Sequence, residues 1–160
     1  MEIKSLELFL SGENIEVFKD IHLKLHSNIK QSDYIDLKMN NYREFLSLYK
    51  DSYVILLKRN DVYIGLLVFA YDKYKKVAYL EELIVSNEYR NKGYGSKLIK
   101  KMKNILKKKS IRIIETDSLN YEEAIYFYEK QEFKKINVKM SKVHSIHNDI
   151  SAFQKMLCKI

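Results

Sequence analysis

The sequence predicts a single α+β domain, residues 1–160, with a β-α-β unit at its centre. Three runs rich in β-branched and aromatic residues, separated by short polar turns, are typical of an antiparallel meander. These runs cover 53–58, 62–71 and 77–85. An amphipathic, lysine-covered helix is then expected at 94–109. The short apolar run 111–116 that follows it indicates a buried strand of the parallel type.

The remaining elements are predicted from hydrophobic periodicity. The first ten residues alternate well enough for an edge strand. Phe18, Ile21, Leu25 and Ile29 recur at the spacing of one helical face. In chain order, we expect a strand at 1–10, helices at 14–29, 40–50 and 120–130, and closing strands at 133–140 and 152–157.

Composition limits the class of protein. No apolar run approaches the roughly 18 residues that a transmembrane helix needs, and the start lacks the features of a signal peptide. Cys158 is the only cysteine, which excludes an internal disulfide and favours a reducing compartment. We therefore expect a cytoplasmic protein without a membrane partner.

The formal net charge of +8 favours an acidic partner, such as nucleic acid, membrane phosphates or a polyanionic cofactor. Lysines are densest at 97–109, where a solvated helix face explains them most simply. No helix-turn-helix or zinc-finger pattern is present, so a nucleic-acid-binding module is only an alternative. His22 and His26 have a spacing that can bind a metal, but no third ligand is evident, and no metal is expected.

The segment Arg90–Ser96 (RNKGYGS) contains Gly93 and Gly95, two of the four glycines of the chain. It connects a predicted strand to a predicted helix, where backbone N–H groups and the helix dipole favour an anion. Glycine lets a phosphate approach the backbone closely, and Arg90, Lys92 and Lys97 flank the segment. The patterns of a P-loop and of a dinucleotide fingerprint are absent. A phosphate-bearing ligand is the hypothesis, and a helix start with flexible glycines is its alternative.

Two stretches resemble the GCN5-related N-acetyltransferase (GNAT) family. RNKGYG matches the family's Arg/Gln-x-x-Gly-x-Gly/Ala signature, and the preceding YLEELIVSNEYR is similar to its fourth strand. About 25 residues after the loop, NYEEAIYFYEKQEF resembles the family's next motif. Its matching residues are Asn120, Ala124, Phe127, Tyr128 and Phe133. The resemblance implies a mixed, mostly antiparallel sheet of about six to seven strands, flanked by about four helices, around an acetyl-CoA-binding β-α-β unit.

The resemblance also implies how acetyl-CoA, the expected co-substrate, is bound. Backbone groups of the strand bind the pantetheine arm, loop amides bind the diphosphate, and the N–H of Val85 polarises the thioester carbonyl. The implied cofactor-binding residues are Leu83, Ile84, Val85, Arg90, Asn91, Lys92, Gly93, Tyr94, Gly95, Ser96, Asn120 and Tyr128.

Two side chains are candidates for catalysis. Glu81 and Glu82 point to opposite faces of a strand, and Glu81 shares its face with Leu83 and Val85. We expect Glu81 to act as the base through a water, with a pKa raised by partial desolvation. Tyr128 matches the family tyrosine near the sulfur of CoA and would protonate the thiolate. The alternatives are a Glu81 that only binds a cationic substrate or pairs with a lysine, and a Tyr128 that only packs.

Other expectations concern the acceptor and one departure from the family pattern. Glu132 occupies the place of a glycine that ends a helix with positive φ; either this residue carries about 1 kcal/mol of strain, or the helix ends differently. The acceptor amine is not identified, although Asp33, Tyr34 and Asp36 would suit a cation. The resemblance leaves homodimer formation open, and an acetyl-CoA sensor without catalysis is a further alternative.

Overall fold

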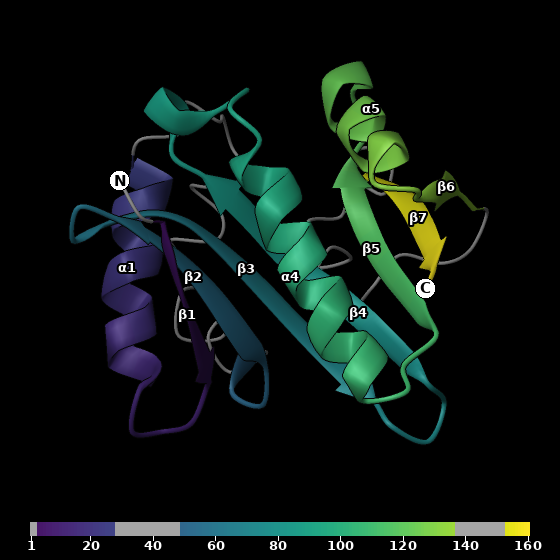
Figure 1. Cartoon of the computed structure of the whole chain (residues 1–160), viewed down its shortest axis with the longest axis horizontal. Coiled ribbons are helices and arrows are strands. Elements are labelled where there is room, and N and C mark those ends of the chain that lie inside the picture. The colour runs from purple at the N-terminus through teal and green to yellow at the C-terminus, as the bar shows by residue number, and fades with distance from the viewer. Residues whose placement is uncertain (1–2, 28–48, 137–152) are drawn as a thin grey trace. The chain divides into compact units, whose positions relative to one another are not determined.

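The computed structural model describes residues 3–27, 49–136 and 153–160. Its strands are β1 (Lys4–Phe9), β2 (Tyr53–Arg59), β3 (Val62–Asp72), β4 (Val77–Val85), β5 (Ile113–Leu119), β6 (Lys134–Lys135) and β7 (Phe153–Lys159). Its helices are α1 (Ile15–Ser27), α4 (Tyr94–Lys108), α5 (Glu122–Lys130) and the 3-10 helix η1 (Asn87–Tyr89). The strands form one sheet in the order β1-β2-β3-β4-β5-β7-β6 (Figure 1).

The predicted fold class is confirmed. Strands β1 to β3 are paired antiparallel, β4 and β5 are parallel, and β7 is antiparallel to both β5 and β6. The sheet is therefore mixed and mostly antiparallel, with a β-α-β unit formed by β4, α4 and β5. The described residues contain three α-helices, and the helix expected at 40–50 lies almost entirely outside them.

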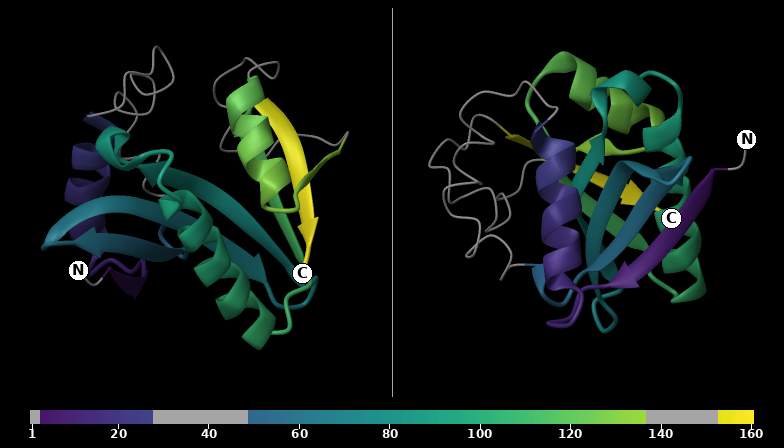
Figure 2. Two further views of the ribbon diagram at one scale, coloured as in Figure 1. Left: turned by 45° about the horizontal axis from the view of Figure 1, so that its top comes forward. Right: turned by 90° about the vertical axis from the view of Figure 1, so that its left-hand side faces the viewer.

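The chain divides into two compact units. The first comprises residues 1–69 and 82–100, and the second comprises 70–81 and 101–160. In the first unit, Phe18, Ile21 and Leu25 of α1 are buried, as the helical spacing predicted. Strand β1 lies at the edge of the sheet beside β2 (Figure 2), and most of its residues are exposed.

Two hairpins give the meander its shape. Asn60 and Asp61 both have positive φ (49° and 60°), which suits a two-residue hairpin between β2 and β3. In the turn between β3 and β4, the Asp72 carboxylate accepts hydrogen bonds from the N–H groups of Lys75 at 3.0 Å and Tyr74 at 2.8 Å. The N–H of Lys75, together with that of Tyr74, lowers the pKa of Asp72.

In the second unit, α5 lies beside β5 and β7 (Figures 1 and 2). The side chains of β5 alternate between buried and half-buried positions, and its buried Thr116 donates a hydrogen bond to the carbonyl oxygen of Leu80 at 2.9 Å. The parallel pairing of β4 with β5 begins at Val77 and Ile113 and ends at Leu80 and Thr116.

The predicted strand 111–116 begins too early, because β5 starts at Ile113 and continues to Leu119. Ile111 instead follows the end of α4, where its N–H donates to the carbonyl of Leu106 at 3.0 Å. Ser110, with φ 58°, donates to Lys107 at 3.0 Å, and together these bonds form a Schellman motif. The buried Ile111 therefore closes a helix, which explains why the apolar run placed the start of the strand too early.

A second Schellman motif ends α5. It includes Phe133, so the strand predicted at 133–140 begins later than expected. Phe133 donates its N–H to Tyr128 and Glu132 donates to Glu129, both at 3.0 Å. Glu132 has φ 70°, so of the two alternatives that the sequence left open, the positive φ is the one found. Strand β6 contains only Lys134 and Lys135, and residues from 137 onward in that prediction lie outside the described part of the chain.

Candidate active site

In the segment between β4 and α4, two basic side chains donate hydrogen bonds to backbone carbonyl groups four or five residues earlier. The Nε of Arg90 donates to the carbonyl oxygen of Val85 at 3.1 Å, and the ammonium of Lys92 donates to the carbonyl of Glu88 at 2.8 Å. Both side chains belong to exposed residues, as does Lys97. Arg90 and Lys92 thus hold the turn in shape, in addition to placing positive charge around it.

Gly93 adopts a left-handed conformation with φ 81°, and Asn91 precedes it with φ 57°. A Cβ atom added at Gly93 would meet no heavy atom within 4 Å, so the space beside this glycine is open. The first hydrogen bond within α4 runs from the N–H of Lys97 to the carbonyl of Gly93 at 3.1 Å. The N–H groups before Lys97 therefore point beyond the end of the helix, beside an open backbone.

Tyr94 anchors the start of α4. It is buried, its ring lies 6.0 Å from that of Tyr89, and its hydroxyl accepts a hydrogen bond from Arg59 at 3.3 Å. The guanidinium of Arg59 also lies 5.9 Å from the centre of the Tyr89 ring. Arg59 was not predicted as a site residue, because it ends a strand far from the glycines and no local pattern links it to them.

Strand β3 approaches the end of β4 closely at Gly65. A Cβ atom at this position would lie 3.0 Å from the carbonyl oxygen of Ile84 and 3.3 Å from Leu98. The N–H of Ser86 also donates to Ile64 at 2.8 Å. A glycine is therefore favoured at position 65 because a side chain would crowd β4, and at position 93 because the backbone has a positive φ.

The two glutamates of β4 have different environments. Buried and half-buried residues alternate along the whole strand, and Glu81 shares the half-buried face with Leu83 and Val85, as predicted from strand geometry. Glu82 is buried on the opposite face, and its carboxylate lies 2.9 Å from Nε2 of the buried His22. From the sequence, His22 was considered only as a metal ligand. Its place on the helical face of Phe18 and Leu25 was a signal that it would be buried.

Asn120 and Tyr128 belong to the second unit. Asn120 is exposed in the connection between β5 and α5, and Tyr128 is half-buried on α5. The ring of Tyr128 lies 5.2 Å from Phe127 and 5.4 Å from Phe133, with edge-on geometry in both pairs. This packing restricts the orientation of the phenol.

An ion-pair group of the second unit was also not predicted. The ammonium of the buried Lys155 lies 3.4 Å from Asp117 and 3.5 Å from Glu115. These residues come from neighbouring strands, since Asp117 of β5 is directly opposite Lys155 of β7. The single positive charge of Lys155 thus faces two carboxylates on this side of the sheet.

Within residues 3–27, 49–136 and 153–160, no group of three or more His, Cys, Asp or Glu side chains could hold a metal ion. His144 and His147 lie outside these ranges, as do Asp33, Tyr34 and Asp36. None of the described helices is long and apolar enough to cross a membrane.

The sequence profile of the acetyltransferase (GNAT) family matches residues 16–133. A protein of Bacillus subtilis strain 168, described as the uncharacterized N-acetyltransferase CgeE, is 33% identical over 75 residues. This match covers 47% of the present chain and 27% of CgeE. The chain thus spans about a quarter of the length of that relative.

Solved structures share the fold over the whole chain. The PaiA N-acetyltransferase of Thermoplasma acidophilum, in complex with coenzyme A, is 20% identical, with a TM-score of 0.70 and full coverage of both chains. Tetrahymena GCN5 is 19% identical, with a TM-score of 0.66, and the match covers 100% of the present chain and 96% of GCN5. Because the family profile matches well over half of the sequence, the chain belongs to the GNAT acetyltransferase family.

Proposed function

We propose that this chain is a single N-acetyltransferase domain that moves an acetyl group from acetyl-CoA directly to a primary amine of a small molecule or a protein. The observation that carries the proposal is the loop before α4. Its left-handed Gly93 borders open space, and the N–H groups at the start of the helix point beyond the helix end. A diphosphate is the kind of anion that such a loop binds.

The proposed cofactor contacts follow the resemblance. The diphosphate lies on the amides of Asn91–Ser96, and the pantetheine arm lies along Leu83–Val85. The last residue of β4 that pairs with β5 is Leu80, so the arm would run along the part of β4 beyond that pairing. Asn120 would contact the same arm. The PaiA relative is described in complex with coenzyme A, which supports this choice of ligand.

In the proposed transfer, the amine nitrogen forms a bond to the acetyl carbon while the carbon–sulfur bond breaks. Glu81, acting through a water, takes the proton that the amine loses. The N–H of Val85 stabilises the negative charge that develops on the carbonyl oxygen. Tyr128 gives a proton to the departing thiolate. The packing of Tyr128 against Phe127 and Phe133 would hold its hydroxyl in a restricted position.

A thermal melt tests the ligand first. Acetyl-CoA at about 100 times its dissociation constant should stabilise the protein by roughly 2.7 kcal/mol, which raises Tm by several degrees. ATP and NADPH serve as controls for a general response to phosphate. An equal rise with all three ligands, or no rise with acetyl-CoA, would contradict the proposal.

The catalytic roles need turnover measurements with a panel of amines. We expect Glu81→Gln to lower kcat by about 100-fold and to shift the pH profile, and Tyr128→Phe to lower kcat by about 10-fold. Both variants should still show the Tm rise with acetyl-CoA. Full activity of either variant would remove that residue from the mechanism while leaving the cofactor site intact.

A further inference from the structure

The buried pair of His22 and Glu82 is the feature that the proposed mechanism does not use. The imidazole Nε2 lies 2.9 Å from the carboxylate, and the two side chains are only 1% and 5% exposed. Both residues belong to the first unit, although 60 positions separate them in the sequence. The contact therefore links helix α1 to strand β4.

Apolar side chains lie near the pair along both elements. The other buried residues of β4 are Ala78, Leu80 and Ile84, none of which can form a side-chain hydrogen bond. On α1, the ring of Phe18 lies 5.3 Å from that of His22, and Leu25 is also buried. Apolar contacts are not directional, so by themselves they fix the position of a helix on a sheet less firmly. A buried hydrogen bond fixes this position more firmly, because a shift of the helix would break the bond and leave a desolvated polar group.

The end of β4 is held at three alternate residues. Glu82 is bound by His22, the carbonyl of Ile84 faces the close approach at Gly65, and the N–H of Ser86 donates to Ile64 at 2.8 Å. Two of these contacts come from the neighbouring strand β3, and the third comes from α1. Between them lie Leu83 and Val85, the residues proposed to bind the cofactor arm and the thioester carbonyl.

We infer that His22 and Glu82 are positioning residues for acetyl transfer, which set where the backbone N–H of Val85 lies relative to the thioester. This inference rests on the proposed function. The diphosphate loop supplies most of the binding of acetyl-CoA, whereas the β4 backbone orients the reacting carbonyl. Loss of the pair therefore affects kcat more than the KM for acetyl-CoA, because a displacement of about 1 Å at a reacting group can cost about 100-fold in rate.

The test uses single and double variants. His22→Leu removes the donor, and His22→Gln keeps an N–H that can reach the carboxylate. We expect His22→Leu to lower kcat at least 10-fold while changing the KM for acetyl-CoA less than 3-fold, and His22→Gln to restore kcat to within about 3-fold of the wild type. The double variant His22→Leu/Glu82→Leu removes both members of the pair, so neither is left buried without the other, and it should fold and still have the low kcat.

Leu25→Ala is the matched control, because it weakens the packing of the same helix face while keeping both members of the pair. It should lower Tm but keep kcat when assayed well below its melting temperature. A double variant with the wild-type kcat, or an equal loss of kcat in Leu25→Ala, would overturn the inference.

A measurement without turnover separates this inference from the proposed function. Amide hydrogen exchange at Leu83, Ile84 and Val85 should be at least 10-fold faster in the double variant than in Leu25→Ala. If the wild type does not bind acetyl-CoA, the proposed function fails whatever the exchange shows. Unchanged exchange at these amides contradicts the positioning role even in an active enzyme.

Discussion

The turn before α4 and the turn after α5 each contain a residue with a positive φ, but the surroundings of the two residues differ. The turn before α4 uses Gly93 with φ 81°, and the turn after α5 uses Glu132 with φ 70°. The space beside Gly93 is empty, whereas the Glu132 carboxylate lies 3.3 Å from the ammonium of Lys103. A left-handed residue other than glycine costs about 1–2 kcal/mol, and contacts with its surroundings must offset this cost.

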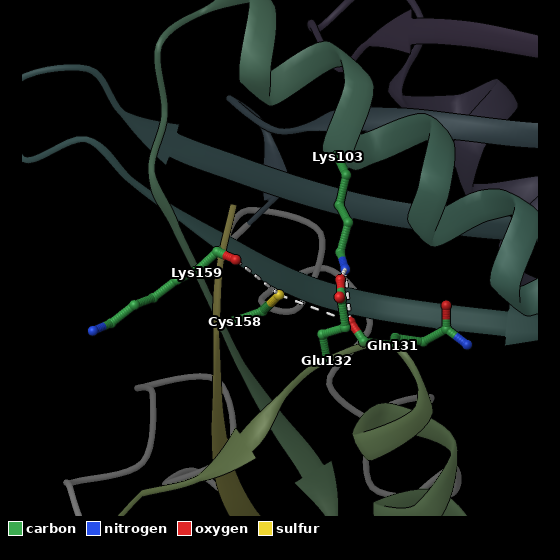
Figure 3. A network of polar contacts seen from close by, with 5 residues as sticks. All are labelled: Lys103, Gln131, Glu132, Cys158 and Lys159. Atoms are coloured by element: carbon green, nitrogen blue, oxygen red, sulfur yellow. Dashed lines mark hydrogen bonds and ion pairs between the residues drawn. The ribbon is translucent and has the colours of Figure 1, made fainter.

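The surroundings of the second turn are shown in Figure 3. The ammonium of Lys103 donates to the carbonyl oxygen of Gln131 at 2.6 Å as well as contacting Glu132. The thiol of Cys158 lies 3.8 Å from the same carbonyl and 3.7 Å from that of Lys159. This turn is thus supported by neighbouring side chains, whereas the turn at Gly93 borders open space. The difference fits the proposal that the first turn binds a ligand, whereas the second ends a helix.

The largest expected effect is at Gly93. Gly93→Ala forces a Cβ atom into the left-handed region and into the space proposed for the diphosphate. We expect acetyl-CoA affinity to fall at least tenfold, or about 1.4 kcal/mol, with a stability loss of about 1 kcal/mol. Titration calorimetry and thermal melts measure the two quantities. Gly12→Ala is the control, since a Cβ at Gly12 also meets nothing within 4 Å. An equal affinity loss in Gly12→Ala would mean that the open space at Gly93 has no special role in binding acetyl-CoA.

The next effect is at Lys103, whose side chain is only 13% exposed. Lys103→Met keeps the aliphatic stem but removes the hydrogen bond to Gln131 and the ion pair with Glu132. Because a charged donor is lost from a part-buried hydrogen bond, the free energy of unfolding should fall by about 2 kcal/mol. Chemical denaturation measures this value, and acetyl-CoA affinity should be unchanged. A stability loss below about 0.5 kcal/mol would mean that the second turn does not depend on its neighbours.

A smaller effect of opposite sign is expected at Glu132. Glu132→Gly relieves the left-handed strain and loses only an ion pair whose carboxylate is 83% exposed, which contributes little. The lysine keeps its bond to Gln131. The free energy of unfolding should therefore rise by about 0.5 kcal/mol. Glu132→Ala, which loses the ion pair but keeps the strain, should not be stabilised, and a gain in that variant would contradict the explanation.

The smallest effect concerns pH. Burial raises the pKa of the Cys158 thiol above its ordinary value of about 9, and the nearby Lys103 opposes part of this shift. A raised pKa in the folded state means that stability from the neutral thiol is complete below pH 9 and is lost as the pH rises from 9 through the folded pKa. Wild-type Tm should therefore fall more steeply than that of Cys158→Ala above pH 9. Parallel curves would contradict a buried, protonated thiol.

The sequence predicted the order of the elements well, because strand alternation and helical periodicity are local signals. The runs at 53–58, 62–71 and 77–85 became β2, β3 and β4 almost unchanged. Its errors occurred where an apolar residue follows a helix. Ile111 and Phe133 were assigned to strands, but each closes a Schellman motif. A buried apolar residue after a helix gives the same sequence signal whether it begins a strand or closes a Schellman motif. Only the hydrogen bonds distinguish the two structures.

The sequence by itself determined the family motif and the loop, since glycines, basic residues and the strand-to-helix change lie within a few positions. It also marked Glu132 as a departure from the family's glycine, but left open whether this residue has a positive φ or the helix ends differently. Tertiary structure decided the contacts between distant residues. The bond between His22 and Glu82 and the support of Glu132 by Lys103 join positions 60 and 29 apart. No local pattern encodes such a pair, because burial and distance depend on how helices and strands pack.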